Sequence, residues 1–108
     1  MLRPMDESAV VDAVRAAVAD RAPLAVQGNG TKRAMLRPVQ AAQTLSTAGL
    51  SGITLYHPAE MVLSARAGTP VPEIEAALAE HNQMLLCEPP DLSALLGAAG
   101  PATIGGLV

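Results

Sequence analysis

The sequence has almost no large aromatic side chains. Its 108 residues include no Trp and no Phe, and Tyr56 is the only Tyr. The core must therefore come from Ala, Val, Leu, Ile and Met, which bury less area per side chain than aromatic residues do. Half of the residues are apolar and the length suits one domain. We expect modest stability, supplemented by a partner or by further chain.

Strong charge and paired cysteines are also missing. The net charge is −3 and the seven basic residues are dispersed along the sequence, which gives no electrostatic footprint for nucleic acid. Cys87 is alone, so no intrachain disulfide can form and the pattern favours an intracellular protein. His57 and His81 have no further ligand at metal-binding spacing, so we expect no metal site. No nucleic-acid partner is expected either.

Long apolar runs are absent as well. No segment approaches the ~20 apolar residues of a membrane span, and the first residues do not form a secretory signal. We expect no membrane span. The last six residues, "TIGGLV", are apolar and glycine-rich, without the capping expected where a domain finishes. We therefore expect the chain to stop inside a domain.

The first quarter of the sequence predicts a helix followed by a strand. Asp6 is a suitable N-cap, and apolar residues recur at helical spacing as far as about Asp20. Pro23 prevents the helix from continuing. Residues 24–27, "LAVQ", then read as a short buried strand that enters a glycine-containing loop. This order is typical of the start of an α/β unit.

The middle of the sequence predicts a small β-meander. Residues 32–43 show no clear period and are interpreted as an irregular crossing, whereas residues 44–47, 53–56 and 61–66 are short β-prone runs separated by turn signals. Thr69 is expected to cap a helix that ends near Asn82, with Pro70 and Pro72 in its first turn. Its glutamates fall on the solvated face: Glu73, Glu75 and Glu80.

After this helix, "MLLC" at residues 84–87 is interpreted as another buried strand, with Cys87 as a small core residue, and residues 92–96 as a brief helical turn. The predicted fold class is mixed α+β in one compact unit.

The stretch "VQGNGTK" at residues 26–32 is the strongest candidate binding motif. Backbone N–H groups of a glycine loop can converge on an anion, while Thr31 offers a hydroxyl and Lys32 a positive charge. Composition alone nevertheless favours an ordinary turn. Neither a Walker loop nor a dinucleotide fingerprint is present, because Arg33 stands where each pattern needs another residue. No serine has a nucleophile-elbow setting, so the sequence offers no catalytic residue.

Three segments in order carry a family resemblance: "PLAVQGNGTK", "GITLYHPAEMVLSARAGTPVPEIEAALAEHNQMLLCEPPD" and "ATIGGLV". From Arg3 to Val108 the chain resembles the start of an FAD-binding domain of the vanillyl-alcohol-oxidase (PCMH) type. Within that group it is most similar to the FAD-binding subunits of bacterial glycolate oxidases. The long middle segment is the specific part of the match.

The resemblance implies a partial PCMH-type domain over residues 1–108. An N-terminal α/β subdomain would occupy about residues 1–88, and residues 89–108 would begin a second subdomain, with FAD between the two. The glycine loop would bind the FAD pyrophosphate, and "TIGG" would lie beside the flavin or its ribityl chain. The implied cofactor-binding residues are Gly28, Asn29, Gly30, Thr31, Lys32, Thr103, Ile104, Gly105 and Gly106, with Pro90 and Asp91 as weaker candidates.

The sequence departs from this family at three positions. Relatives often have Arg where Gln27 stands and Gly where Asn29 stands, so the pyrophosphate would lose a charge-assisted contact and the loop some freedom. Covalent flavoproteins of the superfamily often have His in the position of Thr31. The resemblance therefore implies FAD that is bound non-covalently.

The implied function is the FAD-binding part of a glycolate oxidase subunit, which would oxidise glycolate to glyoxylate by hydride transfer to flavin in the complete complex. The implied partners are a second flavin subunit and an iron–sulfur subunit. The location would be cytoplasmic, or at the inner membrane through that complex. The alternatives are another FAD-linked 2-hydroxy-acid dehydrogenase, such as a D-lactate dehydrogenase, and a non-catalytic folded fragment. Alone, the chain should be half of a flavin site and catalytically silent, and an exposed half-core would favour self-association.

Overall fold

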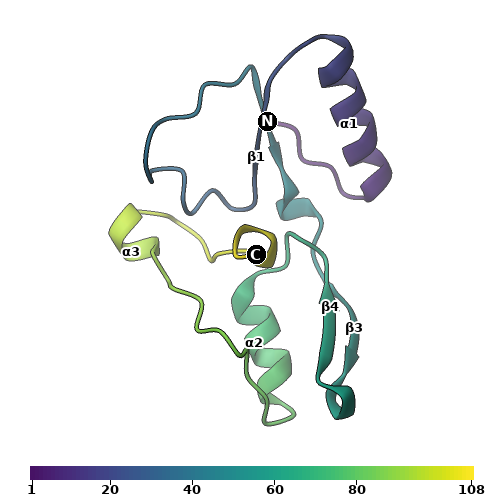
Figure 1. Ribbon diagram of the computed structural model, residues 1–108, viewed down its shortest axis with the longest axis vertical. Coiled ribbons are helices and arrows are strands. Elements are labelled where there is room, and N and C mark those ends of the chain that lie inside the picture. The colour runs from purple at the N-terminus through teal and green to yellow at the C-terminus, as the bar shows by residue number, and fades with distance from the viewer.

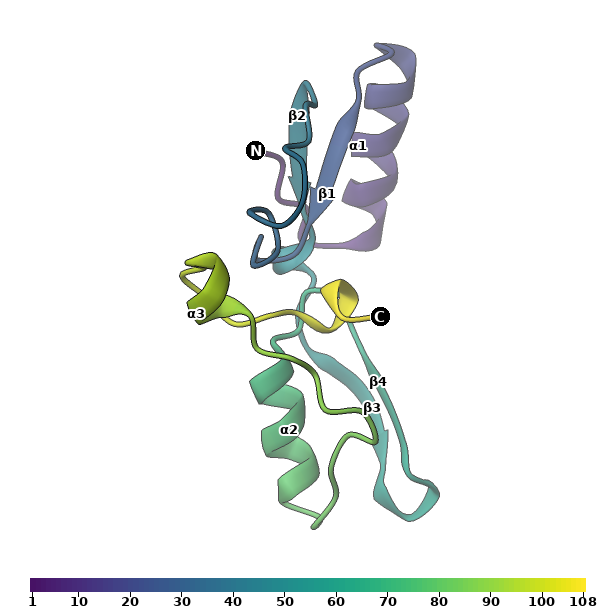
Figure 2. The ribbon, with the colours of Figure 1, turned by 60° about the vertical axis from the view of Figure 1, so that its left-hand side comes forward.

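The computed structural model describes every residue from 1 to 108, arranged as two lobes with the C-terminal segment between them (Figures 1 and 2). The helices are α1 (Glu7–Ala19), α2 (Val71–Ala79) and α3 (Ser93–Leu96), the strands are β1 (Leu24–Gln27), β2 (Gln43–Ser46), β3 (Ile53–His57) and β4 (Val62–Ala65), and the 3-10 turns are η1 (Thr47–Gly49), η2 (Pro58–Glu60) and η3 (Ile104–Gly106).

The first lobe consists of α1, β1 and β2. Strands β1 and β2 are parallel, with Leu24 opposite Gln43 and Gln27 opposite Ser46. Leu2 forms a parallel bridge to Leu45 of β2. A parallel pair needs a crossover connection, and here residues 28–42 supply it as an irregular loop rather than a helix. The carboxyl end of β1 therefore opens directly into the glycine loop.

The second lobe consists of the antiparallel hairpin β3–β4 and α2. The hairpin register pairs Ile53 with Ala65 and His57 with Val62, with one irregularity near Ile53. Ile74 and Leu78, one helical turn apart on α2, are both buried. The Tyr56 hydroxyl donates to Gln83 Oε1, and Gln83 Nε2 donates to the carbonyl of Pro58 at 2.7 Å. These contacts tie the segment after α2 to the hairpin.

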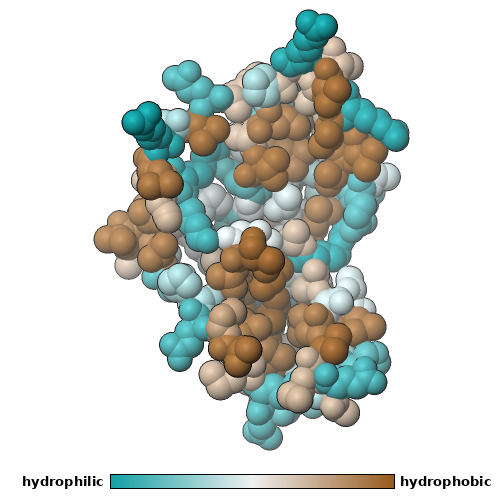
Figure 3. All heavy atoms as spheres, in the orientation of Figure 1, coloured by the Kyte–Doolittle hydropathy of each residue, from teal (hydrophilic) through white to brown (hydrophobic).

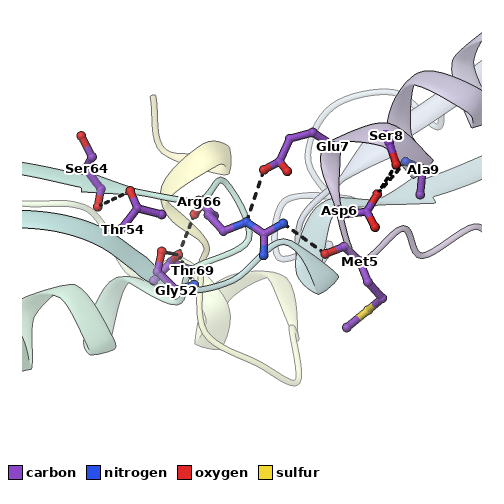
Figure 4. A network of polar contacts seen from close by, with 10 residues as sticks. All are labelled: Met5, Asp6, Glu7, Ser8, Ala9, Gly52, Thr54, Ser64, Arg66 and Thr69. Carbon is purple, nitrogen blue, oxygen red and sulfur yellow. Dashed lines mark hydrogen bonds and ion pairs between the residues drawn. The ribbon is translucent and has the colours of Figure 1, made fainter.

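The lobes meet at the segments around residues 47–52 and 66–69. Gly68 is packed so closely there that an added Cβ would lie 2.1 Å from the carbonyl oxygen of Thr47. The buried Thr69 hydroxyl accepts a 3.0 Å hydrogen bond from the Gly52 N–H. Arg66 reaches across to the first lobe, where it donates to the Met5 carbonyl at 3.1 Å and pairs with Glu7 at 3.4 Å (Figure 4).

The expectation of one compact unit is wrong. The radius of gyration is 15.5 Å, whereas a compact domain of this length has a value of about 13 Å. Only 11 of 108 residues are buried, so each lobe has a thin core. Apolar side chains form patches on both lobes in Figure 3, and the exposed ones include Val11, Val14, Val18, Met61, Met84 and Leu86.

Local signals predicted the helices well. The prediction of Asp6 as N-cap is confirmed. Its carboxylate accepts a hydrogen bond from the Ala9 N–H at 2.8 Å, and its own backbone is extended. The helix ends at Ala19 before Pro23, and the predicted strand at residues 24–27 is β1. The expectation that this strand is buried is wrong, because Val26 is exposed and its neighbours in the strand are only partly buried. The glutamates of α2 are exposed as expected.

Four expectations about the middle of the chain are wrong. Strand β2 pairs with β1 in a parallel sheet and does not belong to a meander with β3 and β4. Pro70 is the N-cap of α2, because the Thr69 hydroxyl is used in the joint between the lobes. Residues 84–87 form no strand, since no neighbouring strand offers them hydrogen-bond partners, and Cys87 is exposed rather than buried.

No helix has both the length and the apolar character needed to cross a membrane.

Candidate cofactor site

The glycine loop opens into a cavity of about 380 Å³ between the first lobe and the C-terminal segment. Three segments far apart in the sequence form its walls: the end of β1 with the loop, the crossing as far as Val39, and residues near η3. Seven of the residues expected at the cofactor line it: Gly28, Asn29, Gly30, Thr31, Lys32, Thr103 and Gly106. The fold therefore brings the glycine loop together with two of the four "TIGG" residues, Thr103 and Gly106.

Two side chains of the loop fasten it to the C-terminal segment. Asn29 Nδ2 donates to the carbonyl of Pro101 at 2.9 Å, and Lys32 Nζ donates to the carbonyl of Gly106 at 2.7 Å. The C-terminal segment is anchored in turn to the second lobe, where the Gly105 N–H donates to the Ala67 carbonyl at 2.8 Å. The cavity thus has one wall on the first lobe and one on the C-terminal segment, which the second lobe anchors.

Two loop glycines are needed for different reasons. At Gly28 an added Cβ would lie 2.1 Å from the Oγ1 of Thr103, so only glycine lets the walls approach this closely. Gly30 has a φ of +69°, a left-handed conformation that glycine adopts without strain. The space beside it faces the side chains of Gln27 and Arg33 at 3.4–3.5 Å. Both features allow a tight loop close to Thr103.

The cavity is electropositive. Lys32, Arg33 and Arg37 line it and no Asp or Glu does, so three of the seven basic residues of the chain gather at one place. Sequence reasoning missed the two arginines because the crossing has no regular period. The available signal was the run "TKRAMLR" at residues 31–37, which places three cations directly after the glycine loop.

Four of the expected residues lie outside this cavity. Gly105 is packed against Ala67, with 2.9 Å between an added Cβ and the Ala67 backbone oxygen. Ile104 lines a separate apolar groove beside β4 and α2. Pro90 and Asp91 line a third hollow next to α3. Hydrogen bonds from Ser93, through its hydroxyl and then its N–H, lower the pKa of Asp91, and this carboxylate caps the N–H of Ser93 at 2.9 Å.

No three His, Cys, Asp or Glu side chains are close enough together to share a metal ion. His57 and His81 are both exposed, and the ring of His81 stands edge-on to Tyr56 with 5.3 Å between centroids.

Comparison with known proteins gives this arrangement a family. Residues 1–108 match the family described as FAD binding domain. This chain belongs to that FAD-binding domain family. It is also 44% identical over 109 aligned positions to the glycolate oxidase subunit GlcE of Escherichia coli (strain K12). The alignment covers all of this chain and 29% of that subunit.

FAD is the cofactor of this FAD-binding domain, and the cavity fits its phosphate groups. The diphosphate bridge of FAD is a compact dianion that needs N–H donors and positive charge. A tight glycine loop with a left-handed residue presents N–H groups, and three cations without a carboxylate provide the charge. The apolar side chains of Val26, Met35 and Val39 complete the lining.

Proposed function

We propose that this chain supplies the diphosphate-binding part of the FAD site in a glycolate-oxidising flavoprotein subunit. The observation that carries the proposal is the cavity in which the glycine loop, three cations and the C-terminal segment meet. In this role Gly28, Gly30 and Thr31 offer donors to the phosphate oxygens. Thr103 and Gly106 of "TIGG" form the opposite wall, and Pro90 and Asp91 stay apart from the phosphates in their own hollow.

Bound FAD supplies the hydride acceptor for oxidation of the substrate. The residues of this chain bind and orient the cofactor; none of them is placed to remove a proton from a substrate. The flavin is held non-covalently, because the loop contains no histidine, cysteine or tyrosine that could be attached to it. Thr31 and Lys32 act through hydrogen bonds and charge.

Glycolate is the substrate that the similarity to GlcE supports. The residues described here contact the phosphates rather than the substrate, so another 2-hydroxy acid such as D-lactate is the competing candidate. The comparison to make is kcat/KM for glycolate against kcat/KM for D-lactate in a purified full-length flavin subunit carrying this segment. A higher value for D-lactate would overturn the assignment of glycolate and leave the FAD site in place.

The proposed partners are a second flavin subunit and an iron–sulfur subunit, because the relative is named as one subunit of a glycolate oxidase. Association would also cover the exposed apolar side chains on both lobes. Co-purification of a flavin-containing and an iron-containing polypeptide with a tagged full-length subunit would support this assembly. A subunit that oxidises glycolate at full rate without them would contradict it.

The proposed FAD site is tested by Gly30→Val in the same full-length subunit. Valine is strained at a φ of +69° and would displace the loop N–H groups, so FAD occupancy should fall at least about tenfold. Gly97→Val is the matched control, because Gly97 has a φ of +66° with nothing within 4 Å of an added Cβ. It carries the same backbone strain outside the cavity. Equal flavin absorbance in the two variants would mean that the loop is only a turn.

A further inference from the structure

Arg33 is held in place by two neighbouring strands. Its Nη1 donates to Oε1 of Gln27 at 2.7 Å and lies 3.4 Å from Oγ1 of Thr44. Gln27 is the last residue of β1, and Thr44 lies on β2 opposite Ala25. The guanidinium is therefore positioned by the parallel sheet itself, although it belongs to an irregular loop.

Two other polar side chains of the loop are already engaged. Lys32 Nζ donates to the Gly106 carbonyl and Asn29 Nδ2 donates to the Pro101 carbonyl. Those contacts join the walls of the cavity, so a donor of each side chain is committed to the C-terminal segment. Arg33, by contrast, has five N–H donors, and only Nη1 takes part in a hydrogen bond within the protein. Its Nε and Nη2 remain available to a ligand.

The surroundings of Arg33 also favour an anion. An added Cβ on Gly30 would lie 3.5 Å from Cδ of Arg33, so the arginine stem runs beside the left-handed residue of the loop. Arg37 is the next cation along the same wall, and no carboxylate lines the cavity to neutralise either charge. A planar guanidinium matches two phosphate oxygens at once, which a lysine ammonium cannot do.

We propose that Arg33 is the cation that binds the diphosphate, that Gln27 and Thr44 are its positioning residues, and that Lys32 and Asn29 instead fasten the glycine loop to the C-terminal segment. This inference rests on the proposed FAD site and assigns its charge. It moves the main electrostatic contact from the loop lysine to the neighbouring arginine.

The test uses the 108-residue chain and inorganic pyrophosphate as the probe. Pyrophosphate is added stepwise, and NMR spectra record the backbone amide and arginine Nε–H resonances. The signals of residues 28–33 and of the Arg33 side chain should shift. Arg33→Gln should weaken pyrophosphate binding about five- to tenfold, as expected when a charge-assisted bidentate contact is removed. Arg33→Lys should recover only part of the loss. Arg15→Gln, an exposed cation on α1 outside the cavity, is the control for net charge.

The positioning role of Gln27 has its own readout. Gln27→Glu keeps the side-chain length and places a carboxylate against the guanidinium, so it should neutralise Arg33 and weaken pyrophosphate binding as much as Arg33→Gln does. Gln27→Met removes the acceptor and should weaken pyrophosphate binding less. The chemical shift of the Arg33 Nε–H should then move toward that of a mobile arginine. Lys32→Met should mainly perturb the signals of residues 101–106 and weaken pyrophosphate binding less than Arg33→Gln.

The possible results separate the two proposals. If pyrophosphate shifts the loop signals of the wild-type chain and Arg33→Gln binds as tightly as Arg15→Gln, the role of Arg33 is overturned and the proposed site stands. If the wild-type loop signals do not move at all, both proposals are overturned. Selective loss in Arg33→Gln and in Gln27→Glu supports both.

Discussion

The two lobes differ in what their connections contribute: the first lobe forms most of the cavity, and the second is held together mainly by apolar contacts. The first lobe has a parallel pair of strands, a 15-residue crossing from residue 28 to residue 42, and three cations around a cavity. The second has a tight antiparallel hairpin and a helix, with apolar contacts and one polar link through Tyr56. A parallel pair requires a long connection, and that connection is free to carry polar groups. The strands and helix of the hairpin lobe contribute no residue to the cavity lining.

The contrast extends to the glycines. In the first lobe Gly30 uses its conformational freedom, whereas Gly68 and Gly105 are needed because a neighbouring backbone occupies the space of a side chain. The glycine loop therefore needs both the conformation of Gly30 and the small size of Gly28, whereas Gly68 and Gly105 are needed for their size alone.

The largest loss of stability should come from Gly68→Ala at the joint between the lobes. The new Cβ would lie 2.1 Å from the Thr47 carbonyl oxygen and 2.7 Å from that of Leu50, and both are backbone atoms that cannot turn away. We expect a loss of at least about 3 kcal/mol, at the upper end of overpacking effects. The free energy of unfolding in urea measures it. Gly100→Ala is the control, because its nearest neighbour would be 4.0 Å away; equal stability of the two variants would contradict the packing of the joint.

The contact between the cavity walls should appear as coupling between residues 28 and 103. Gly28→Ala places a methyl group against Oγ1 of the buried Thr103 and should cost about 2 kcal/mol. Thr103→Ala removes the clashing oxygen, so the double variant should be more stable than the sum of the single changes predicts, by about 1 kcal/mol. Urea unfolding of all four proteins measures this difference. Strict additivity would mean that the two walls do not touch in solution.

A smaller effect is expected in the hairpin lobe from Tyr56→Phe. The ring remains against His81, but Gln83 Oε1 loses its donor, so the free energy of unfolding should fall by about 1 kcal/mol. The cavity lies on the other lobe, and the pyrophosphate shifts of residues 28–33 should therefore persist. Loss of those shifts in this variant would show that the lobes are more tightly coupled than the structure indicates.

The smallest expected effect concerns the N-cap of α1. The N–H of Ala9 and then the hydroxyl of Ser8 lower the pKa of Asp6 below 3.8. A carboxylate with a lowered pKa stabilises the folded state above its unfolded pKa, and this contribution disappears as the pH falls through the folded value. The stability difference between wild type and Asp6→Ala should thus shrink below about pH 4. A constant difference from pH 7 to pH 2 in urea unfolding would contradict the cap.

The sequence predicted local elements where one residue dominates the choice. Asp6 and Pro23 delimit α1, and the β-prone runs at residues 53–56 and 61–66 correspond to β3 and β4. The prediction failed where an apolar run has no local partner: "MLLC" at residues 84–87 looked like a buried strand, but no strand lies beside it. The pairing of β2 with β1 was also invisible, because the partners are separated by the crossing and no local pattern records which strand is adjacent.

For the site, the sequence by itself determined the ingredients: a glycine loop after a strand, a cation run and a distant "TIGG". Their chemistry alone favoured an ordinary turn, whereas their order along the sequence indicated the FAD-binding family. Only the tertiary structure decided which groups converge. It set Thr103 against Gly28, used Lys32 and Asn29 to fasten the walls, and held Arg33 on the strand ends. The contacts of Lys32 and Asn29 join residues more than 70 positions apart, and the Arg33 contacts need β1 and β2 to be paired, so these distances exist only after the chain has folded.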